Sequence, residues 1–135
     1  MQYKYLMFDF DGVLAETNTI RVEGFYELFH DYSSEQLGRF TDFLNKNGGL
    51  SRYTKIRYFF SDILQESISD ESVREWALKY SEIVKEKIIQ APAVEGSIEF
   101  LENYRATFSF AIVSGSDQDE LRSVCRARRI AHYFD

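Results

Sequence analysis

Cysteine and proline are scarce in this chain, and long apolar runs are absent from it. With only one cysteine, Cys125, no internal disulfide can form. No apolar segment approaches the roughly 20 residues that span a bilayer, and Asp9 interrupts the N-terminal apolar run too early for a secretory signal. Positive charge is also in short supply, because 16 basic residues face 22 acidic ones and the net charge is −6. Nucleic-acid binding needs the opposite balance, so we expect a cytoplasmic protein with neither a nucleic-acid nor a membrane partner.

Apolar and aromatic residues, in contrast, are plentiful. Of the 135 residues 44% are hydrophobic, and they include 12 Phe and 9 Tyr. A disordered chain lacks such residues, and a chain of this length buries enough surface to form a real core. The composition therefore predicts one globular domain, or one domain that carries an inserted module.

Two short apolar runs predict buried strands of a parallel sheet, at Tyr5–Phe8 and at 108–113. Each run is followed by a turn and a helical pattern, as in a doubly wound, Rossmann-like α/β fold. Ser33 and Gln36 predict a capping box, and Pro92 marks the end of the longest helical pattern. Apolar residues at helical spacing predict helices over 22–29, 37–44, 56–64, 73–88, 97–104 and 117–129. We therefore assign residues 1–15 and 92–135 to a partial α/β core and residues 16–91 to a helical insertion.

A pair of acids, Asp9 and Asp11, ends the first predicted strand. Residues two apart on an extended chain project to the same side, and open α/β sheets bind their ligands at the carboxyl ends of strands. Two adjacent carboxylates repel each other unless a cation offsets them, and oxygen ligands of this kind suit Mg²⁺. A helix cap or an ordinary Asp-Gly turn at Asp11-Gly12 is the alternative interpretation.

The segment Phe8–Leu14 resembles the first motif of the haloacid dehalogenase-like hydrolase superfamily in its phosphatase form. The segment Ile112–Ser116 resembles its second motif, and the helical insertion lies where this superfamily carries a cap domain. Gly49–Arg52 is similar to the substrate-facing cap loop of the branch that contains phosphoglycolate phosphatases and β-phosphoglucomutases. The resemblance implies an enzyme, a phosphatase, because the dehalogenases lack an acid at the position of Asp11.

This resemblance also implies a role for each matching residue. Asp9 would attack the phosphoryl group and form an aspartyl-phosphate, and Asp11 would act as general acid and then as general base. The cofactor would be Mg²⁺, held by the Asp9 carboxylate and the Asp11 backbone carbonyl. Ser114 and the backbone near Gly115 would bind the phosphoryl oxygens. The partner would be a small phosphorylated metabolite.

Two of these residues have ordinary structural interpretations as well. Ser114 or Ser116 is suited to cap the helix that follows, and Ser116 with Asp119 fits a capping box. Arg52 is placed to grip an anionic group of a substrate, or it is simply a solvated charge near the start of a helix.

Two further parts of the family pattern do not occur in this sequence. No lysine follows Lys87 to offset the negative charge of the nucleophile and the phosphate, and no later acid pair completes a metal site. We therefore expect an N-terminal fragment of a longer hydrolase, catalytically weak or inactive by itself, whose exposed sheet edge favours self-association. A phosphomutase of the β-phosphoglucomutase type and a non-catalytic binding or assembly module are the alternative functions.

Overall fold

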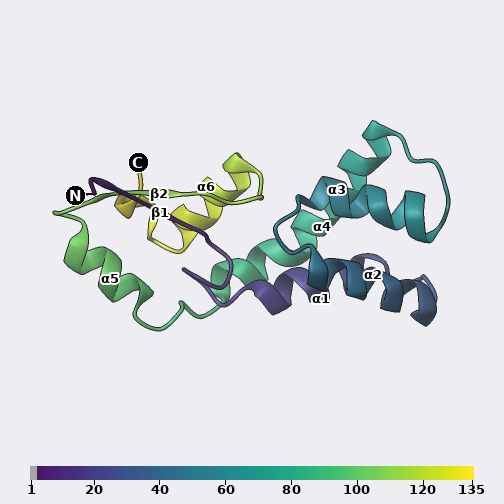
Figure 1. Cartoon of the computed structure of the whole chain (residues 1–135), viewed down its shortest axis with the longest axis horizontal. Helices are drawn as coiled ribbons and strands as arrows, with labels where there is room; N and C mark the ends of the chain where they lie inside the picture. Colours follow the sequence, from purple (N-terminus) through teal and green to yellow (C-terminus); the bar gives the residue numbers. More distant parts are fainter. Residues whose placement is uncertain (1–2) are drawn as a thin grey trace. The chain divides into compact units, whose positions relative to one another are not determined.

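A computed structural model describes residues 3–135, which form two compact units (Figure 1). The first unit comprises the chain up to Thr19 together with Lys87–Asp135, and the second comprises Ile20–Glu86. The chain thus passes between the units within two helices, α1 (Asn18–Leu28) and α4 (Asp70–Gln90). The assignment of a core to residues 1–15 and 92–135 and of a cap to residues 16–91 stays a prediction.

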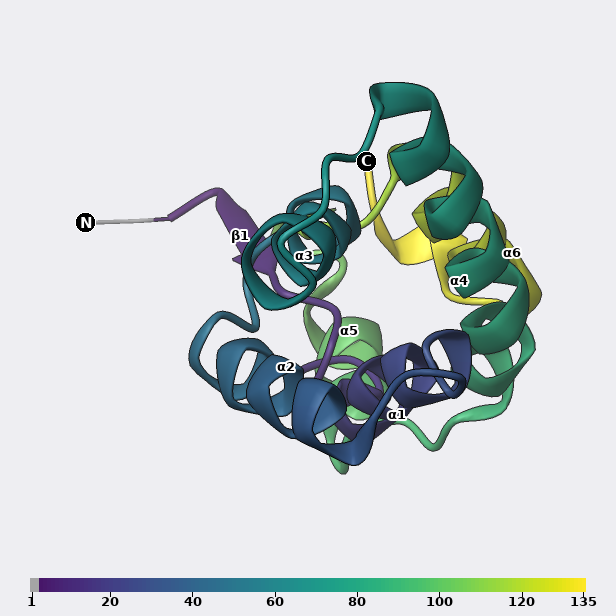
Figure 2. The ribbon, with the colours of Figure 1, turned by 90° about the vertical axis from the view of Figure 1, so that its right-hand side faces the viewer.

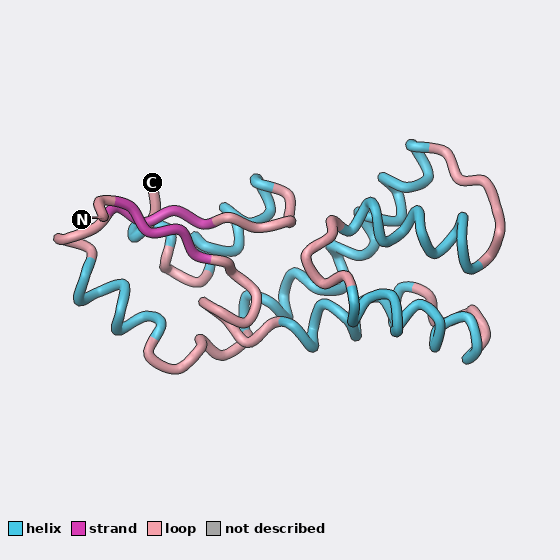
Figure 3. The backbone as a smooth tube through the Cα atoms, viewed as in Figure 1, coloured by secondary structure: helices cyan, strands magenta, loops and turns pink. Residues whose placement is uncertain are grey.

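The first unit is built on two parallel strands. β1 (Tyr5–Phe8) pairs with β2 (Ser109–Ile112) in a register that sets Phe8 opposite Ile112, and Figure 3 shows the strands side by side. Three helical segments complete this unit: α5 (Ser97–Tyr104) before β2, and α6 (Gln118–Ala127) and the short 3-10 helix η2 (Ala131–Tyr133) after it. Both strands and both long helices were predicted, and the α/β fold class is confirmed.

The two faces of this sheet differ in their burial. The Phe8 ring lies edge-on to Phe110, with 5.4 Å between centroids, and also contacts Phe100 of α5. Tyr5 and Met7 point to the opposite face and are 69% and 75% exposed. The prediction of a fully buried first strand is therefore wrong. Successive side chains alternate between faces, and only the Phe8 face is packed.

The end of the chain extends the sheet on the other side of β2. Phe134 forms a parallel bridge with Phe110, and the Asp135 N–H donates to the Phe110 carbonyl at 3.0 Å. Ser109 and Val113 already use their N–H groups to bind the backbone of the β1 segment, at Lys4 and Phe8. Because hydrogen-bonding groups alternate between the two sides of a strand, the Phe134 segment lies on the side of β2 away from β1.

The second unit is helical, and Figure 2 shows it from one end. It contains most of α1 and α4, with α2 (Ser34–Lys46), α3 (Arg52–Tyr58) and a π-helical turn, η1 (Phe59–Ile63), between them. Ser33 and Gln36 form the predicted capping box at the start of α2. The helix expected over 56–64 instead changes to π-helical geometry at Phe59. Within residues 3–135 no helix is both long and apolar enough to cross a membrane.

Stacked aromatic rings form the core of the helical unit. The Phe29 ring stacks on Phe59 with 4.0 Å between centroids, and Phe25 stacks on Tyr80 at 4.2 Å. Phe40 lies against both pairs, 5.4 Å from Phe25 and 5.0 Å from Phe59. All five side chains are buried. Such pairs add about 0.5–1.5 kcal/mol each beyond the burial of their area, so this unit has a core of its own.

Candidate active site

The acid pair lies at the carboxyl end of β1, as the sequence predicts. Asp9 directly follows the strand, and its Oδ1 accepts a hydrogen bond from the Phe10 N–H at 2.7 Å. The Asp11 Oδ1 accepts a hydrogen bond from the Thr17 hydroxyl at 2.5 Å. Both carboxylates are thus held by donors from their own segment, and such bonds favour one orientation of each side chain.

A tight turn separates Asp11 from the helix that follows. Gly12 has φ +74°, and its N–H donates to the Ala15 carbonyl at 2.8 Å. A Cβ at this position would lie 2.3 Å from the side-chain nitrogen of Asn18. The Asn18 side chain is exposed and can turn aside, so it is the positive φ that favours glycine here.

The second predicted motif lies beside the first because the strands are parallel. The last pair in the sheet is Phe8 with Ile112, and just beyond it the Val113 N–H donates to the Phe8 carbonyl at 2.8 Å, so Asp9 and Ser114 each directly follow a partner of this hydrogen bond. The Ser114 hydroxyl accepts a hydrogen bond from the Ser116 N–H at 3.2 Å across Gly115. The structure therefore brings Asp9, Asp11 and Ser114 to one edge of the sheet, where α/β proteins bind ligands.

Neither serine caps the helix after β2. The N-cap of α6 is Asp117, which makes no capping hydrogen bond through its side chain, and the helix begins at Gln118. The capping box proposed for Ser116 and Asp119 is thus wrong, because the N-cap position falls one residue later, at Asp117. The Ser114 hydroxyl is used in the turn itself.

Arg52 lies in the helical unit and is not a solvated charge. Its side chain is buried, with the residue 6% exposed, and it donates to the Ser81 hydroxyl. The guanidinium carbon also lies 5.1 Å from the centroid of the Tyr80 ring, within cation–π distance. The interpretation of Arg52 as a surface charge is therefore wrong, and its part in substrate binding stays a prediction.

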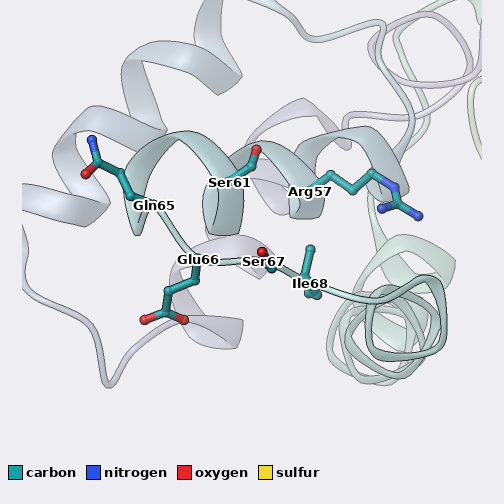
Figure 4. A pocket seen from close by; sticks show the side chains of 6 residues that line it. All are labelled: Arg57, Ser61, Gln65, Glu66, Ser67 and Ile68. Atoms are coloured by element: carbon teal, nitrogen blue, oxygen red, sulfur yellow. The ribbon is translucent and has the colours of Figure 1, made fainter.

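The helical unit also carries an open pocket of about 490 Å³ near η1. Figure 4 shows that its polar side chains point away from one another: Arg57 extends to one side, Gln65 to the other, and Glu66 away from both. Its lining comprises Arg57, Ser61, Gln65, Glu66, Ser67 and Ile68. None of them is a predicted site residue, and nothing converges on a ligand position.

The residues that suit a metal are oxygen donors only. Residues 3–135 contain no group of three His, Cys, Asp or Glu side chains that could hold a metal by themselves. One carboxylate and one backbone carbonyl, at Asp9 and Asp11, nonetheless fit Mg²⁺, which commonly takes one or two carboxylates and completes its shell with water and phosphate.

Thr17 is a candidate that the sequence analysis missed. It is fully buried and bonded to Asp11, although it lies six residues further along the chain. A threonine just before a helix is typical of an N-cap, so the local pattern gave no reason to connect it with the acid pair.

The parallel strands, the acid pair at their carboxyl edge and the separate helical unit define an α/β protein of mixed architecture. The chain belongs to the haloacid dehalogenase-like hydrolase family, whose family model matches residues 6–135. The resemblance read from Phe8–Leu14 is thereby confirmed. No curated protein matches the chain significantly.

Solved structures share the fold at low sequence identity. A β-phosphoglucomutase from Clostridium difficile is 19% identical with a TM-score of 0.75, and the match covers 100% of this chain and 60% of that one. A predicted phosphatase from Clostridium acetobutylicum is 19% identical with a TM-score of 0.74 and the same coverage. A third structure is described as the HAD-hydrolase YfnB from Bacillus subtilis bound to magnesium. It is 16% identical with a TM-score of 0.68, and the match covers 100% of this chain and 64% of that one. The chain thus spans less than two thirds of the length of these structures.

Proposed function

We propose that this protein is a Mg²⁺-dependent phosphomonoester hydrolase that acts through an aspartyl-phosphate. The observation that carries the proposal is the meeting of Asp9, Asp11 and Ser114 at the carboxyl edge of two paired strands. A nucleophile, a proton donor and a hydroxyl for phosphoryl oxygens are the groups that this reaction needs. Membership of a hydrolase family supports the same chemistry.

The reaction would run in two displacements at phosphorus. In the first, a carboxylate oxygen of Asp9 attacks the phosphorus, the bond to the leaving oxygen breaks, and Asp11 gives that oxygen a proton. In the second, water attacks the same phosphorus while Asp11 takes a proton from it. The bond to Asp9 then breaks, which releases inorganic phosphate and restores both carboxyl groups.

Anionic groups must approach each other in both steps. Mg²⁺ held by the Asp9 carboxylate and the Asp11 backbone carbonyl would supply the charge neutralisation that allows this approach. Ser114 and the N–H groups near Gly115 would orient the phosphoryl oxygens. The substrate class we propose is a small phosphorylated metabolite, with Arg52 as a further candidate for binding its anionic groups.

Catalysis by this chain is expected to be slow. The sequence has no lysine after Lys87 to balance the negative charges at the site, and residues 3–135 hold no three-acid metal cluster. Both displacements need this balance, so we expect both the formation and the hydrolysis of the aspartyl-phosphate to be slow.

The test measures both phosphate release and covalent labelling. The chain is incubated with radiolabelled acetyl phosphate and with a panel of sugar phosphates, phosphoglycolate and an aryl phosphate, with and without Mg²⁺. Asp9→Asn removes the nucleophile and keeps the side-chain size. Asp42→Asn, on an exposed position of α2, makes the same change of charge outside the proposed site.

We expect Mg²⁺-dependent release and an acid-stable label at Asp9, both lost in Asp9→Asn and retained in Asp42→Asn. A folded chain that shows neither release nor label would contradict the proposal and favour a non-catalytic binding or assembly module. A new phosphorylated product, rather than free phosphate, would identify a phosphomutase.

A further inference from the structure

The loop between β1 and α1 folds back on itself and is fixed at both ends. Within it, the Leu14 N–H donates to the Phe10 carbonyl at 2.9 Å, and the Thr17 N–H donates to the Ala15 carbonyl at 3.0 Å. This path returns Thr17 to Asp11, so the contact between them is a consequence of the turn.

The residues around Pro92 hold the same loop from outside. The Glu16 N–H donates to the Pro92 carbonyl at 2.9 Å, and the Val94 N–H donates to the Leu14 carbonyl at 3.2 Å. Ala15 forms an antiparallel bridge with Ala93 at this place. The backbone that leads into Thr17 is therefore anchored, and α1 begins directly after it at Asn18.

The buried Thr17 hydroxyl has two possible hydrogen-bond acceptors. Its acceptors are the Asp11 Oδ1 at 2.5 Å and the Ala15 carbonyl at 3.4 Å, and the residue is 0% exposed. A hydroxyl has only one proton, and a bond to a carboxylate is stronger than one to a neutral carbonyl. Asp11 is thus the preferred acceptor.

We propose that Thr17 is a positioning residue that holds the Asp11 carboxylate in the orientation needed for proton transfer. This inference rests on the proposed function, since it assigns Thr17 to the general acid and base of that reaction. A proton donor works only within hydrogen-bond reach of its target, and small misplacements reduce rates strongly. Thr17 suits the task because it is β-branched, buried and fixed by an anchored backbone.

A purely structural role for Thr17 makes a different prediction. A helix cap or loop brace would affect all substrates alike. A residue that positions the acid matters most where the leaving oxygen needs a proton, as in an alkyl phosphate, and least for 4-nitrophenyl phosphate, whose leaving group is stable without one.

The test compares kcat/KM for glycerol 2-phosphate and 4-nitrophenyl phosphate, because kcat/KM reports only the steps through formation of the aspartyl-phosphate. Thr17→Val removes the hydroxyl and keeps the shape, Thr17→Ser keeps the hydroxyl, and Thr19→Val makes the same exchange at an exposed site two residues away. We expect Thr17→Val to lower kcat/KM at least about tenfold for the alkyl ester and no more than about threefold for the aryl ester. Thr17→Ser should restore most of the loss, and Thr19→Val should match the parent chain.

A double-mutant cycle in urea unfolding tests the contact without turnover. Thr17→Val should raise the unfolding constant about fivefold in the parent chain and leave it unchanged in Asp11→Ala, because the bond is then already absent. Equal losses for both esters, no recovery in Thr17→Ser, or a cycle without coupling would each overturn the positioning role. Absence of any Asp9-dependent release or label would instead refute the proposed function, and the positioning role with it.

Discussion

Two helical glycines provide a matched test of how closely the helices of the second unit pack. Gly24 lies in α1, where a Cβ would lie 2.3 Å from Val84 Cγ1 and 3.1 Å from Tyr80 Cε2 of α4. Gly38 lies in α2, and a Cβ there meets no atom of the described residues within 4 Å. The methyl group of an alanine would therefore overlap neighbouring atoms at Gly24 and meet none of the described atoms at Gly38.

The expected changes in the free energy of unfolding have opposite signs. Alanine is more favourable than glycine within a helix by about 0.5–1 kcal/mol, so Gly38→Ala should stabilise the unit by that amount. At Gly24 the same gain is outweighed, because forcing a methyl group into a packed core costs about 1–3 kcal/mol. We expect Gly24→Ala to be destabilising by about 1–2 kcal/mol after this subtraction.

The fluorescence of Trp76 reports on the unfolding of the helical unit, because this residue lies within that unit. It is the only tryptophan of the chain, and its ring lies 5.3 Å from Phe29 and 5.6 Å from Phe60. Urea unfolding monitored by its fluorescence should give a higher midpoint for Gly38→Ala and a lower one for Gly24→Ala.

A compensating variant separates overlap from other causes. In a Val84→Ala background the Cγ1 atom that Gly24→Ala would meet is gone, so the two substitutions should cost less together than the sum of their separate effects. A Gly24→Ala variant that is as stabilising as Gly38→Ala would refute the close approach of α1 to α4.

Two further predictions concern α6. The Arg128 guanidinium donates to the carbonyls of Ile88 at 2.9 Å and Ala91 at 2.7 Å, at the end of α4. Arg128→Ala should lower the free energy of unfolding in urea by about 2–3 kcal/mol, because these buried acceptors lose a charged donor. The exposed Arg126→Ala should change stability by less than about 0.5 kcal/mol, and equal effects of the two would contradict the assignment. Burial raises the pKa of the Cys125 thiol, with Arg128 opposing that rise, so less thiolate is present at a given alkaline pH than in the unfolded chain. Iodoacetamide at pH 8 should therefore label Cys125 slowly in the folded chain and quickly in urea, and equal rates would argue against its burial.

The sequence predicted the elements of this fold well because their signals are local. The run Tyr5–Phe8 is a strand with the predicted bounds, and the capping box at Ser33 and Gln36 needs only residues three apart. The Asp9 and Asp11 pair could be located for the same reason, since a strand end and a following Gly12 are read directly from the chain. Local pattern is sufficient where the structure depends on neighbours in sequence.

The features that the sequence did not predict depend on distant residues. An apolar run does not tell which face of a strand is covered, so the exposure of Met7 could not be foreseen. The change to π-helical geometry at Phe59 leaves the apolar spacing of the segment intact and gives no signal in it. Nothing in the sequence near Arg128 indicates that its guanidinium donates to carbonyls about forty residues earlier in the chain, such as that of Ile88.

The acid pair and the helical insertion are stabilised by separate sets of contacts. The loop that carries Asp11 is held by its own turn and by the backbone at Pro92 and Val94, all within the α/β unit. The helical unit is held by its own aromatic core, in which Phe29 stacks on Phe59. Substitutions in that core should therefore leave the orientation of Asp11 unchanged, whereas changes near Pro92 reach the acid through the loop even though they lie about eighty residues away in sequence.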